Sequence, residues 1–363
     1  MVTVIFREFF NHFRLMIALV TGTRPQLIQD AMISHELDAQ KIPYYLVDTG
    51  QHYDESMSGI FYEKLQIKKP KYQLKCGGVT SISMIAKMMC SLEEIFESSR
   101  PEIIMCNGDT NTTLASALVA DRMQIPFAHP ESGYRRFTHN IPEETNRVTA
   151  DHIAKYLFAY TKDCFENLKN EGLCGKPNVI CKYTGDVLYD AYLKYSAMEN
   201  QAMEKFTKDP FILMTIHRNN NVTPEKIQEI LKQVGGISHY KTIFPMHPRT
   251  TKLVAENNIQ IPGNIIAISP VDYLEIQYLL KNASFIITDS GGLAREAHFA
   301  KKFCLSLDAG FEFEHVITKP YMHIVKPEEI IETFAKIQGL KYDLENQFGN
   351  GTAAKEIVLC LKK

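Results

Sequence analysis

Three acidic segments contain side chains that could move protons. Asp109 lies in the segment NGDTNTT, Glu131 in HPESG, and Glu143 with Glu144 in IPEETNR. Carboxylates that lie close together act as general acids and bases, or stabilise a sugar ring that develops positive charge. Short motifs also occur by chance, so spacing alone favours a structural interpretation by roughly two to one. In that interpretation Glu143 and Glu144 are ordinary first-turn charges of a helix.

A second set of residues could bind phosphate. Arg24 follows the first apolar run in the segment GTRP, Arg218 follows His217 after a later run, and His247 lies in the loop PMHPRT. Arginine matches the geometry of phosphate oxygens well. A single loop arginine is more often a plain surface charge, but similar positions after several apolar runs favour an anion site.

The segment TDSGG places small residues where an apolar run meets a helical pattern. Ser290, Gly291 and Gly292 leave backbone N–H groups open to an anion, which the helix dipole also attracts. A tight turn with Asp289 or Ser290 as the helix N-cap has about equal weight. Glu296 follows one turn later and could accept hydrogen bonds from ribose hydroxyls, or be a solvated surface charge.

Apart from IPEETNR, in which Glu143 begins a helix, these polar segments follow short apolar runs that indicate β-strands. Each run precedes a helical pattern, and the alternation predicts a parallel sheet covered by helices. Ligands of such sheets collect beyond the carboxyl ends of the strands, so we expect the polar segments to line an active site. The predicted strands are residues 15–20, 44–47, 103–106, 126–129, 211–216, 242–244, 265–268 and 285–288.

The chain divides into two similar halves. The alternation pauses near residues 184–190, continues with a polar helical stretch over residues 193–206, and then begins again. A chain of 363 residues also exceeds the size at which a single core keeps growing. We therefore predict an α/β protein of two Rossmann-like domains with parallel sheets facing an interdomain cleft. The expected domains are residues 1–187, residues 188–345, and a C-terminal helix within 346–363 that packs back on the first domain.

Composition excludes several classes of function. The formal net charge is −2, so no basic surplus exists to neutralise a nucleic acid. No run of about 18 apolar residues predicts a membrane span. In residues 1–14, Arg7 and His12 interrupt the apolar residues, and we expect an extension rather than a signal peptide. Metal-ligand spacings and the usual dinucleotide and P-loop motifs do not occur, so we expect no metal and no cofactor.

The eight cysteines include no C-x-x-C pair, and several lie inside apolar runs. Eight would suit four disulfides in a small secreted domain. A chain of this length favours reduced thiols and a cytoplasmic protein instead.

Together the segments resemble the non-hydrolysing UDP-N-acetylglucosamine 2-epimerase family, whose fold is the two-domain GT-B arrangement of glycosyltransferases. Any one segment is weak evidence, but nine in the same order cover most of the chain. The matching segments are GTRP (22–25), TGQH (49–52), GDTNTTLA (108–115), H-x-E-x-G-x-R (129–135), PEETNR (142–147), TGD (184–186), HR (217–218), HPR (247–249) and TDSGG with Glu296 (288–296).

The resemblance implies elimination of UDP across C1 and C2 of the sugar, giving a 2-acetamidoglucal, followed by readdition of UDP. The C2 proton becomes acidic only once the anomeric C–O bond breaks, so the site must stabilise a departing diphosphate and exchange protons at C2. The implied catalytic residues are Asp109, Glu131, Glu143 and His217. The implied UDP-binding residues are Arg24, Arg147, His247, Ser290, Gly291, Gly292 and Glu296. Arg147 has no support beyond its place in PEETNR.

The chain departs from the family pattern where the substrate would be recognised. Gln26 and Gln29 replace a Glu and a Lys, Tyr53 replaces an Arg, and the segment 308–314 matches only at its ends. Residues 49–74 resemble instead the branch that acts on UDP-2,3-diacetamido-2,3-dideoxyglucuronic acid.

We therefore expect a UDP-N-acetylhexosamine 2-epimerase for surface polysaccharide synthesis, a homodimer with no nucleic-acid or membrane partner. The alternatives are the 2-epimerase of the diacetamido uronate, a GT-B glycosyltransferase, and an inactive UDP-sugar-binding protein. A glycosyltransferase would not need the three carboxylates around C2, and an inactive protein would bind UDP without turnover. Hydrolysis ranks lower, because a hydrolysing branch carries GTRAD where this chain has GTRP.

Overall fold

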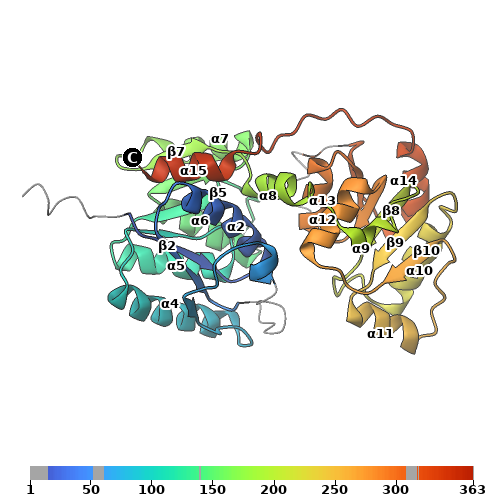
Figure 1. Ribbon diagram of the computed structural model, residues 1–363, viewed down its shortest axis with the longest axis horizontal. Coiled ribbons are helices and arrows are strands. Elements are labelled where there is room, and N and C mark those ends of the chain that lie inside the picture. Colours follow the sequence, from blue (N-terminus) through green and yellow to red (C-terminus); the bar gives the residue numbers. More distant parts are fainter. Residues whose placement is uncertain (1–14, 52–60, 139, 308–316, 318, 363) are drawn as a thin grey trace, which may run out of the picture. The chain divides into compact units, whose positions relative to one another are not determined.

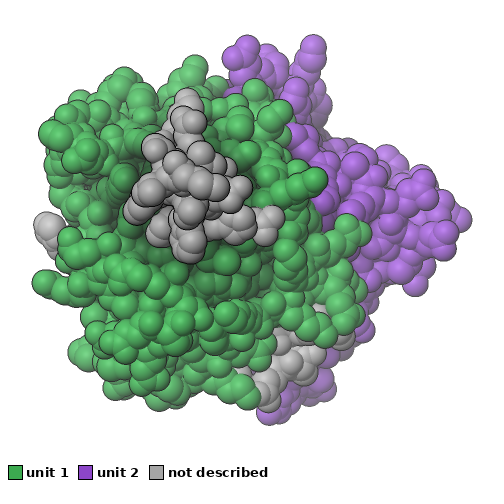
Figure 2. Space-filling view, turned by 60° about the vertical axis from the view of Figure 1, so that its left-hand side comes forward, with its two compact units in different colours: residues 1–191, 347–363 green, residues 192–346 purple. Residues whose placement is uncertain are grey.

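The computed structural model describes residues 15–51, 61–138, 140–307, 317 and 319–362. The chain forms two compact units (Figure 2): unit 1 contains residues 1–191 and 347–363, and unit 2 contains residues 192–346. The predicted extension over residues 1–14, the substitution at Tyr53 and the segment 308–314 lie outside the described residues.

Unit 1 contains a parallel sheet whose seven described strands have the order β3-β2-β1-β4-β5-β6-β7 (Figure 1). Its elements are β1 (Ile17–Thr21), α2 (Arg24–Ala39), β2 (Tyr44–Asp48), β3 (Tyr72–Gln73), α4 (Ser81–Ser98), β4 (Ile103–Met105), α5 (Asn111–Arg122), β5 (Phe127–Ser132), α6 (Pro142–Ile153), β6 (Tyr156–Ala159), α7 (Lys162–Asn170), the 3₁₀ helix η1 (Leu173–Gly175), β7 (Ile180–Tyr183) and α15 (Ala353–Leu361). Helix α8 (Val187–Tyr195) continues from unit 1 into unit 2.

Unit 2 contains a second parallel sheet, in which the six described strands have the order β10-β9-β8-β11-β12-β13. Its elements are α9 (Gln201–Glu204), β8 (Phe211–Thr215), α10 (Pro224–Gly235), β9 (Lys241–Pro245), α11 (Pro248–Glu256), β10 (Ile265–Ile268), α12 (Tyr273–Asn282), β11 (Phe285–Thr288), α13 (Gly291–Phe299), β12 (Phe303–Ser306), β13 (Met322–Ile324), the 3₁₀ helix η2 (Pro327–Glu329) and α14 (Ile330–Ile337).

The two sheets share one winding pattern, and the prediction of two Rossmann-like halves is confirmed. In each, the chain moves outward from a central strand, returns to its other side and continues in the opposite direction. The reversal falls between β1 and β4 in unit 1 and between β8 and β11 in unit 2. Right-handed crossovers then place α2 and α5 on opposite faces, as Figure 1 shows. Such a reversal is the point where parallel sheets bind ligands.

The strands are apolar because helices cover both faces of each sheet. All five residues of β1, the segment IALVT, are buried. In unit 2, β11 packs under α14, where the rings of Phe285 and Phe334 lie 4.8 Å apart in an edge-on contact. This burial explains why the strands are visible in the sequence as short runs without alternation.

The polar stretch over residues 193–206 corrects one prediction, because it is not a single helix. Helix α8 ends at Tyr195, and α9 begins after Asn200, whose side chain accepts a hydrogen bond from the backbone N–H of Met203 at 3.3 Å. An asparagine side chain satisfies a free N–H group at the start of a helix and competes with the backbone inside one.

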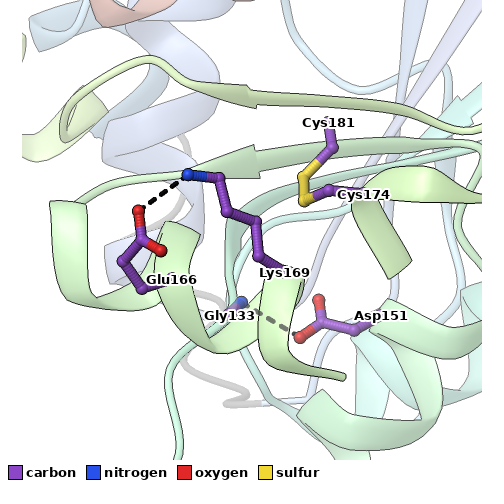
Figure 3. Close-up of a disulfide and its surroundings, with 6 residues drawn as sticks. All are labelled: Gly133, Asp151, Glu166, Lys169, Cys174 and Cys181. Atoms are coloured by element: carbon purple, nitrogen blue, oxygen red, sulfur yellow. Dashed lines mark hydrogen bonds and ion pairs between the residues drawn. A yellow bond between two sulfur atoms is a disulfide. The ribbon is translucent and has the colours of Figure 1, made fainter. Parts of the chain in front are cut away.

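The cysteines correct a second prediction. Cys174 in η1 and Cys181 in β7 form a disulfide (Figure 3). Their Cα atoms lie 5.1 Å apart, within the range that a disulfide bridges, because η1 leads directly into β7. The spacing matches no common motif, so the sequence did not indicate it. The remaining six cysteines have free thiols.

The C-terminal helix α15 packs against α2 within unit 1. Asp190 of α8 accepts hydrogen bonds from the backbone N–H groups of Ala353 (3.2 Å) and Ala354 (2.8 Å) and so caps the start of α15. Burial raises the pKa of Asp190 to about 6, although these two hydrogen bonds oppose the change. None of the described helices is both long and apolar enough to cross a membrane.

The turn at Gly185 holds the segment that leads into α15. Gly185 has φ +83°, and a Cβ atom there would lie 2.9 Å from the carbonyl oxygen of Phe348 and 3.0 Å from Cα of Gly349. The N–H of Asp186 donates to the same carbonyl at 2.9 Å. The close approach of two backbone segments therefore depends on the missing side chain.

We predict that Gly185→Ala lowers the free energy of unfolding by about 2–4 kcal/mol, because it combines a left-handed backbone with a steric clash. Gly172→Ala is the matched control: its φ is +70°, and no atom of the described residues lies within 4 Å of the added Cβ. It should cost only about 1 kcal/mol. Urea denaturation followed by circular dichroism measures both values. Equal losses in the two variants would contradict the packing role of Gly185.

Candidate active site

The three predicted catalytic carboxylates of unit 1 lie at one edge of the sheet. Asp109 follows β4, Glu131 lies near the end of the adjacent strand β5, and Glu143 is in the first turn of α6. Glu143 is exposed, whereas Asp109 and Glu131 are half-buried. Burial raises the pKa of Asp109, the charge of Arg147 opposes this, and the neighbouring carboxylates of Glu131 and Glu143 raise it further. The structure thus brings the three together.

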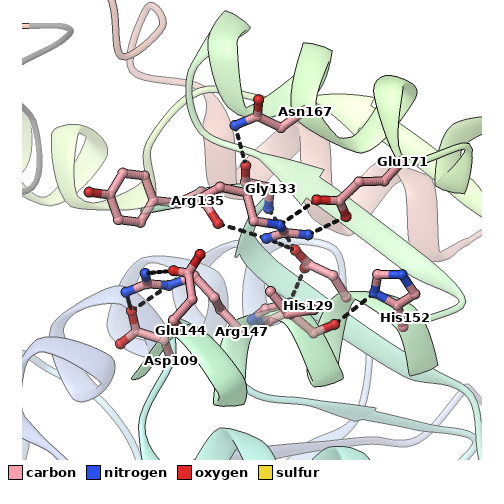
Figure 4. Close-up of polar contacts among 12 residues, drawn as sticks. Asp109, His129, Gly133, Arg135, Glu144, Arg147, His152, Asn167 and Glu171 are labelled. Atoms are coloured by element: carbon pink, nitrogen blue, oxygen red, sulfur yellow. Dashed lines mark hydrogen bonds and ion pairs between the residues drawn. The ribbon is translucent and has the colours of Figure 1, made fainter. Parts of the chain in front are cut away.

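Arg147 of α6 lies between two carboxylates (Figure 4). Its Nε donates to Asp109 Oδ2 at 3.0 Å, and its Nη1 donates to Glu144 at 2.5 Å. The guanidinium also lies 4.6 Å from the centroid of the Tyr134 ring. The sequence prediction made Arg147 a UDP-binding residue. In unit 1 it orients Asp109, and a contact with UDP stays a prediction.

Glu144 differs from its neighbour Glu143, because it is buried and structural. Besides the ion pair with Arg147, it accepts hydrogen bonds from the backbone N–H groups of Arg136 (3.0 Å) and Phe137 (2.9 Å). The structural interpretation of the Glu-Glu pair is therefore correct for Glu144. The exposed carboxylate of Glu143 is the one that a ligand can reach.

The backbone of Glu131 is strained. Its φ is +65°, and the pairing of β5 with β6 shifts register between Pro130 and Ser132. A left-handed conformation at a residue other than glycine costs about 1–3 kcal/mol and persists only where the surroundings impose it. Gln29 of α2 holds the side chain, because its Nε2 donates to Glu131 Oε2 at 2.9 Å.

A buried charge network under β5 is the part of the site that sequence reasoning missed. His129 Nδ1 lies 2.7 Å from Asp151 Oδ1, and Arg135 Nη1 donates to Asp151 Oδ2 at 2.7 Å. Arg135 also makes two hydrogen bonds of 2.7 Å with Glu171. His129 and Arg135 belong to the H-x-E-x-G-x-R motif, which gave a role only to Glu131. Asp151 lies two turns into α6, where no pattern distinguishes it.

Gln26 also acquires a role that the sequence did not indicate. Its Oε1 accepts from the N–H of Gly22 at 3.0 Å, and its Nε2 donates to the carbonyl of Asn107 at 2.7 Å. The amide therefore joins the turn after β1 to the turn after β4. A glutamate at this position could accept the first hydrogen bond but could not donate the second. Arg24, the exposed first residue of α2, starts the helix beside this junction.

In unit 2, Asp289 organises the loop that carries His217. It is buried at the end of β11 and accepts hydrogen bonds from the backbone N–H groups of His217 (3.1 Å) and Arg218 (2.9 Å). Burial alone would raise the pKa of Asp289, but the hydrogen bonds from His217, Arg218 and Asn221 lower it. The imidazole Nδ1 of His217 lies 3.1 Å from the same carboxylate, which leaves Nε2 as the nitrogen that a ligand can meet.

The start of α13 fits both interpretations of the TDSGG segment, the helix N-cap and the anion site. Ser290 is the N-cap, and its hydroxyl accepts from the N–H of Leu293 at 3.3 Å. Among the described residues, the Ser290 hydroxyl, at 3.9 Å, is the one atom within 4 Å of a Cβ added at Gly292. The first-turn N–H groups of a helix attract anions, so the same turn fits an anion site. Gly291 is the first residue of this helix.

Glu296 is not the solvated surface charge that the alternative interpretation described. It is buried, and its Oε1 accepts hydrogen bonds from the Tyr273 hydroxyl (2.9 Å) and from Gln277 Nε2 (2.8 Å). Both partners belong to α12, and they fix the carboxylate in one orientation. His247, the exposed N-cap of α11 after β9, accepts from the N–H of Arg249 through Nδ1.

The candidate site residues thus occupy the same position in the fold of both units. Polar side chains come from the ends of β1, β4 and β5 in unit 1 and of β8, β9 and β11 in unit 2, next to the reversal of each sheet. Among the described residues, no group of three or more His, Cys, Asp or Glu side chains could hold a metal ion. These residues can transfer protons through carboxylates and bind anions through backbone N–H groups and cationic side chains.

Comparison with known proteins identifies this combination. The family model for UDP-N-acetylglucosamine 2-epimerase matches residues 35–362. UDP-N-acetylglucosamine 2-epimerase of Methanocaldococcus jannaschii is 36% identical over 362 residues, with 95% of this chain and 98% of the relative covered. The UDP-2,3-diacetamido-2,3-dideoxy-D-glucuronate 2-epimerase of Pseudomonas aeruginosa is 33% identical, with 96% and 99% covered.

A solved structure agrees in fold over the whole chain. The crystal structure of the M. jannaschii UDP-GlcNAc 2-epimerase in complex with UDP-GlcNAc and UDP has a TM-score of 0.83 at 35% identity and covers 96% of this chain and 99% of its own. The family model and the fold of this relative therefore agree. The chain belongs to the UDP-N-acetylglucosamine 2-epimerase family.

Proposed function

We propose that this protein is a non-hydrolysing UDP-sugar 2-epimerase that interconverts UDP-N-acetylglucosamine and UDP-N-acetylmannosamine for surface polysaccharide synthesis. The observation that carries the proposal is the group formed by Asp109, Glu131 and Glu143 in a chain of this family. We propose the cytoplasm as the compartment because six of the eight cysteines have free thiols, although Cys174 and Cys181 form a disulfide.

Inversion at C2 sets what these carboxylates must do. A proton leaves C2 from one face of the sugar and returns on the other, so two different groups must exchange protons with that carbon. Elimination breaks the C2–H and C1–O bonds and gives 2-acetamidoglucal and UDP; readdition of UDP to C1 reverses both. The raised pKa of Asp109 favours a group that accepts and holds a proton.

Unit 2 supplies the groups that suit UDP. The open first turn of α13 at Ser290 and Gly291 offers N–H groups to the diphosphate. Arg218 and His217 lie on the adjacent strand end, and the buried Glu296, which Tyr273 holds by a hydrogen bond, is our candidate acceptor for ribose hydroxyls. His217, fixed by Asp289 through Nδ1, could donate a proton from Nε2 to the departing diphosphate.

We predict that the enzyme incorporates deuterium at C2 of UDP-N-acetylglucosamine in D₂O and yields the UDP-linked epimer. Incubation followed by NMR measures both. The UDP-diacetamido uronate is the second substrate, because the P. aeruginosa relative is named for it. Exchange with only this compound would assign the uronate branch. Free sugar would indicate hydrolysis, and no change in either compound would contradict the proposal.

The variant Glu131→Gln should lower turnover by about 10²–10⁴-fold, the typical contribution of general acid–base catalysis. The amide is isosteric and retains an acceptor for Gln29, so UDP should bind with unchanged affinity in isothermal titration calorimetry. Glu225→Gln, which changes an exposed glutamate of α10, is the control. Normal turnover of Glu131→Gln would show that Glu131 is not catalytic.

We also propose that the protein is a homodimer that pairs through the first half of α4. This segment exposes a cluster of apolar side chains: Ile82 is 84% exposed, Val79 before the helix is 50% exposed, and Ile85 and Met89 are half-buried on the following turns. Exposed apolar residues that gather on one helix face favour a protein partner. A two-fold axis would place the same face of a second copy against it.

Ile82→Lys should therefore convert the dimer to a monomer, because each interface would bury two lysines without a partner charge. Sedimentation velocity at micromolar concentration measures the change. Leu340→Lys alters an apolar side chain of unit 2 that is 46% exposed and should leave the mass unchanged. A monomeric wild type, or a dimeric Ile82→Lys variant, would contradict this interface.

A further inference from the structure

The buried histidine under the carboxylates has hydrogen-bond acceptors on both sides of its ring. His129 Nδ1 lies 2.7 Å from the Asp151 carboxylate, and Nε2 lies 2.7 Å from the carbonyl oxygen of Gly108. A neutral imidazole has a single N–H and could donate to only one of these acceptors. An imidazolium donates to both. The side chain of His129 is fully buried, so no water takes either place.

The charges around the ring balance only if His129 is a cation. Asp151 also accepts from Arg135, and Arg135 pairs with Glu171, so the network contains two carboxylates. With His129 protonated it contains two cations as well. A neutral histidine would leave the buried Asp151 to share the single charge of Arg135 with Glu171.

The network touches both catalytic loops. The Asp151 carboxylate makes hydrogen bonds with three groups of one segment: the His129 ring, the N–H of Gly133 at 3.0 Å and the Arg135 guanidinium. Glu131, whose backbone is left-handed, lies in the middle of this segment, so these contacts fix the chain on both sides of it. Figure 3 shows the contact between Asp151 and Gly133. Gly133 has no room for a side chain, since a Cβ would lie 2.2 Å from the carbonyl oxygen of Cys164.

His129 contacts the loop that carries Asp109 through its other ring nitrogen, Nε2. The carbonyl that His129 Nε2 contacts belongs to Gly108, the residue before Asp109. One ring therefore connects the backbone at Asp109 to the segment around Glu131.

We propose that His129 is an imidazolium at neutral pH which, with Asp151, positions the two carboxylates Asp109 and Glu131 for proton transfer at C2. This inference rests on the proposed epimerase function and deepens it. His129 and Asp151 do not exchange protons with the sugar. They are positioning residues that hold two proton-transfer groups at a fixed separation, which general acid–base catalysis requires.

The protonation of His129 agrees with the groups that face it. Burial alone would lower the pKa of His129, but the hydrogen bond and charge of Asp151, the Gly108 carbonyl and the charge of Asp109 raise it above its usual value. Arg135 faces the far side of Asp151 and is neutralised by Glu171. Because the pKa is raised in the folded state, the stabilisation is complete at acidic pH and is lost as the pH rises through the raised value.

Nitrogen NMR of the wild-type enzyme tests the charge directly. With ¹⁵N-labelled histidine at pH 7.5, both ring nitrogens of His129 should carry a proton, and the signal is assigned by its loss in His129→Gln. A neutral ring with one unprotonated nitrogen would overturn the proposal. This measurement does not depend on turnover, so it remains decisive even if the proposed epimerase activity fails.

Kinetics of Asp151→Asn tests the positioning role. Turnover should fall by about 100-fold, because a misplacement of about 1 Å at a catalytic group costs a factor of this order. KM and the Kd for UDP should change less than about twofold, and the His129 signal should become that of a neutral ring. Asp163→Asn, an exposed aspartate in the first turn of α7, is the control. Normal turnover of Asp151→Asn would refute the positioning role and leave the proposed function intact.

Discussion

The carboxylate of Asp151 is the contact on which the catalytic edge of unit 1 depends. It is buried and accepts hydrogen bonds from a ring, a backbone N–H and a guanidinium within one seven-residue motif. A buried carboxylate without partners would be strongly unfavourable, so the chain around it must bend until three donors face it. The strained backbone of Glu131 follows from this bend. The strain in the backbone of Glu131 is thus offset by the contacts that His129 and Gly133, two residues away on either side, make with Asp151.

Unit 2 also contains a buried carboxylate that needs hydrogen-bond donors, that of Asp289. Asp289 is also buried at a strand end, and it also fixes a histidine and the backbone that follows it. The difference is exposure. His129 is fully buried with both ring nitrogens in contact, whereas the His217 side chain is 48% exposed and has Nε2 open. A similar pair therefore holds loops in place in unit 1 and presents a proton donor in unit 2.

Much of this site could be predicted from the sequence, and the reason is topological. Parallel strands end at a common edge, so polar residues after apolar runs must gather there, as Asp109 and Glu131 do. The supporting contacts could not be predicted, because they join residues far apart in the chain. His129 and Asp151 are 22 positions apart, and Gln29 and Glu131 are 102 apart. Nothing in the spacing of a helix or strand indicates such pairs.

The departures from the family pattern acquire a physical meaning only through these contacts. A lysine at position 29 would give Glu131 a charged partner; Gln29 keeps the hydrogen bond at 2.9 Å without the charge. The positive charge near the carboxylates then comes from Arg147, which contacts Asp109, and from the ring of His129 below them. Both cations are buried and held by fixed carboxylates. The absence of a charge at the buried position 29 is therefore compatible with a group of carboxylates whose geometry is fixed by Arg147 and His129.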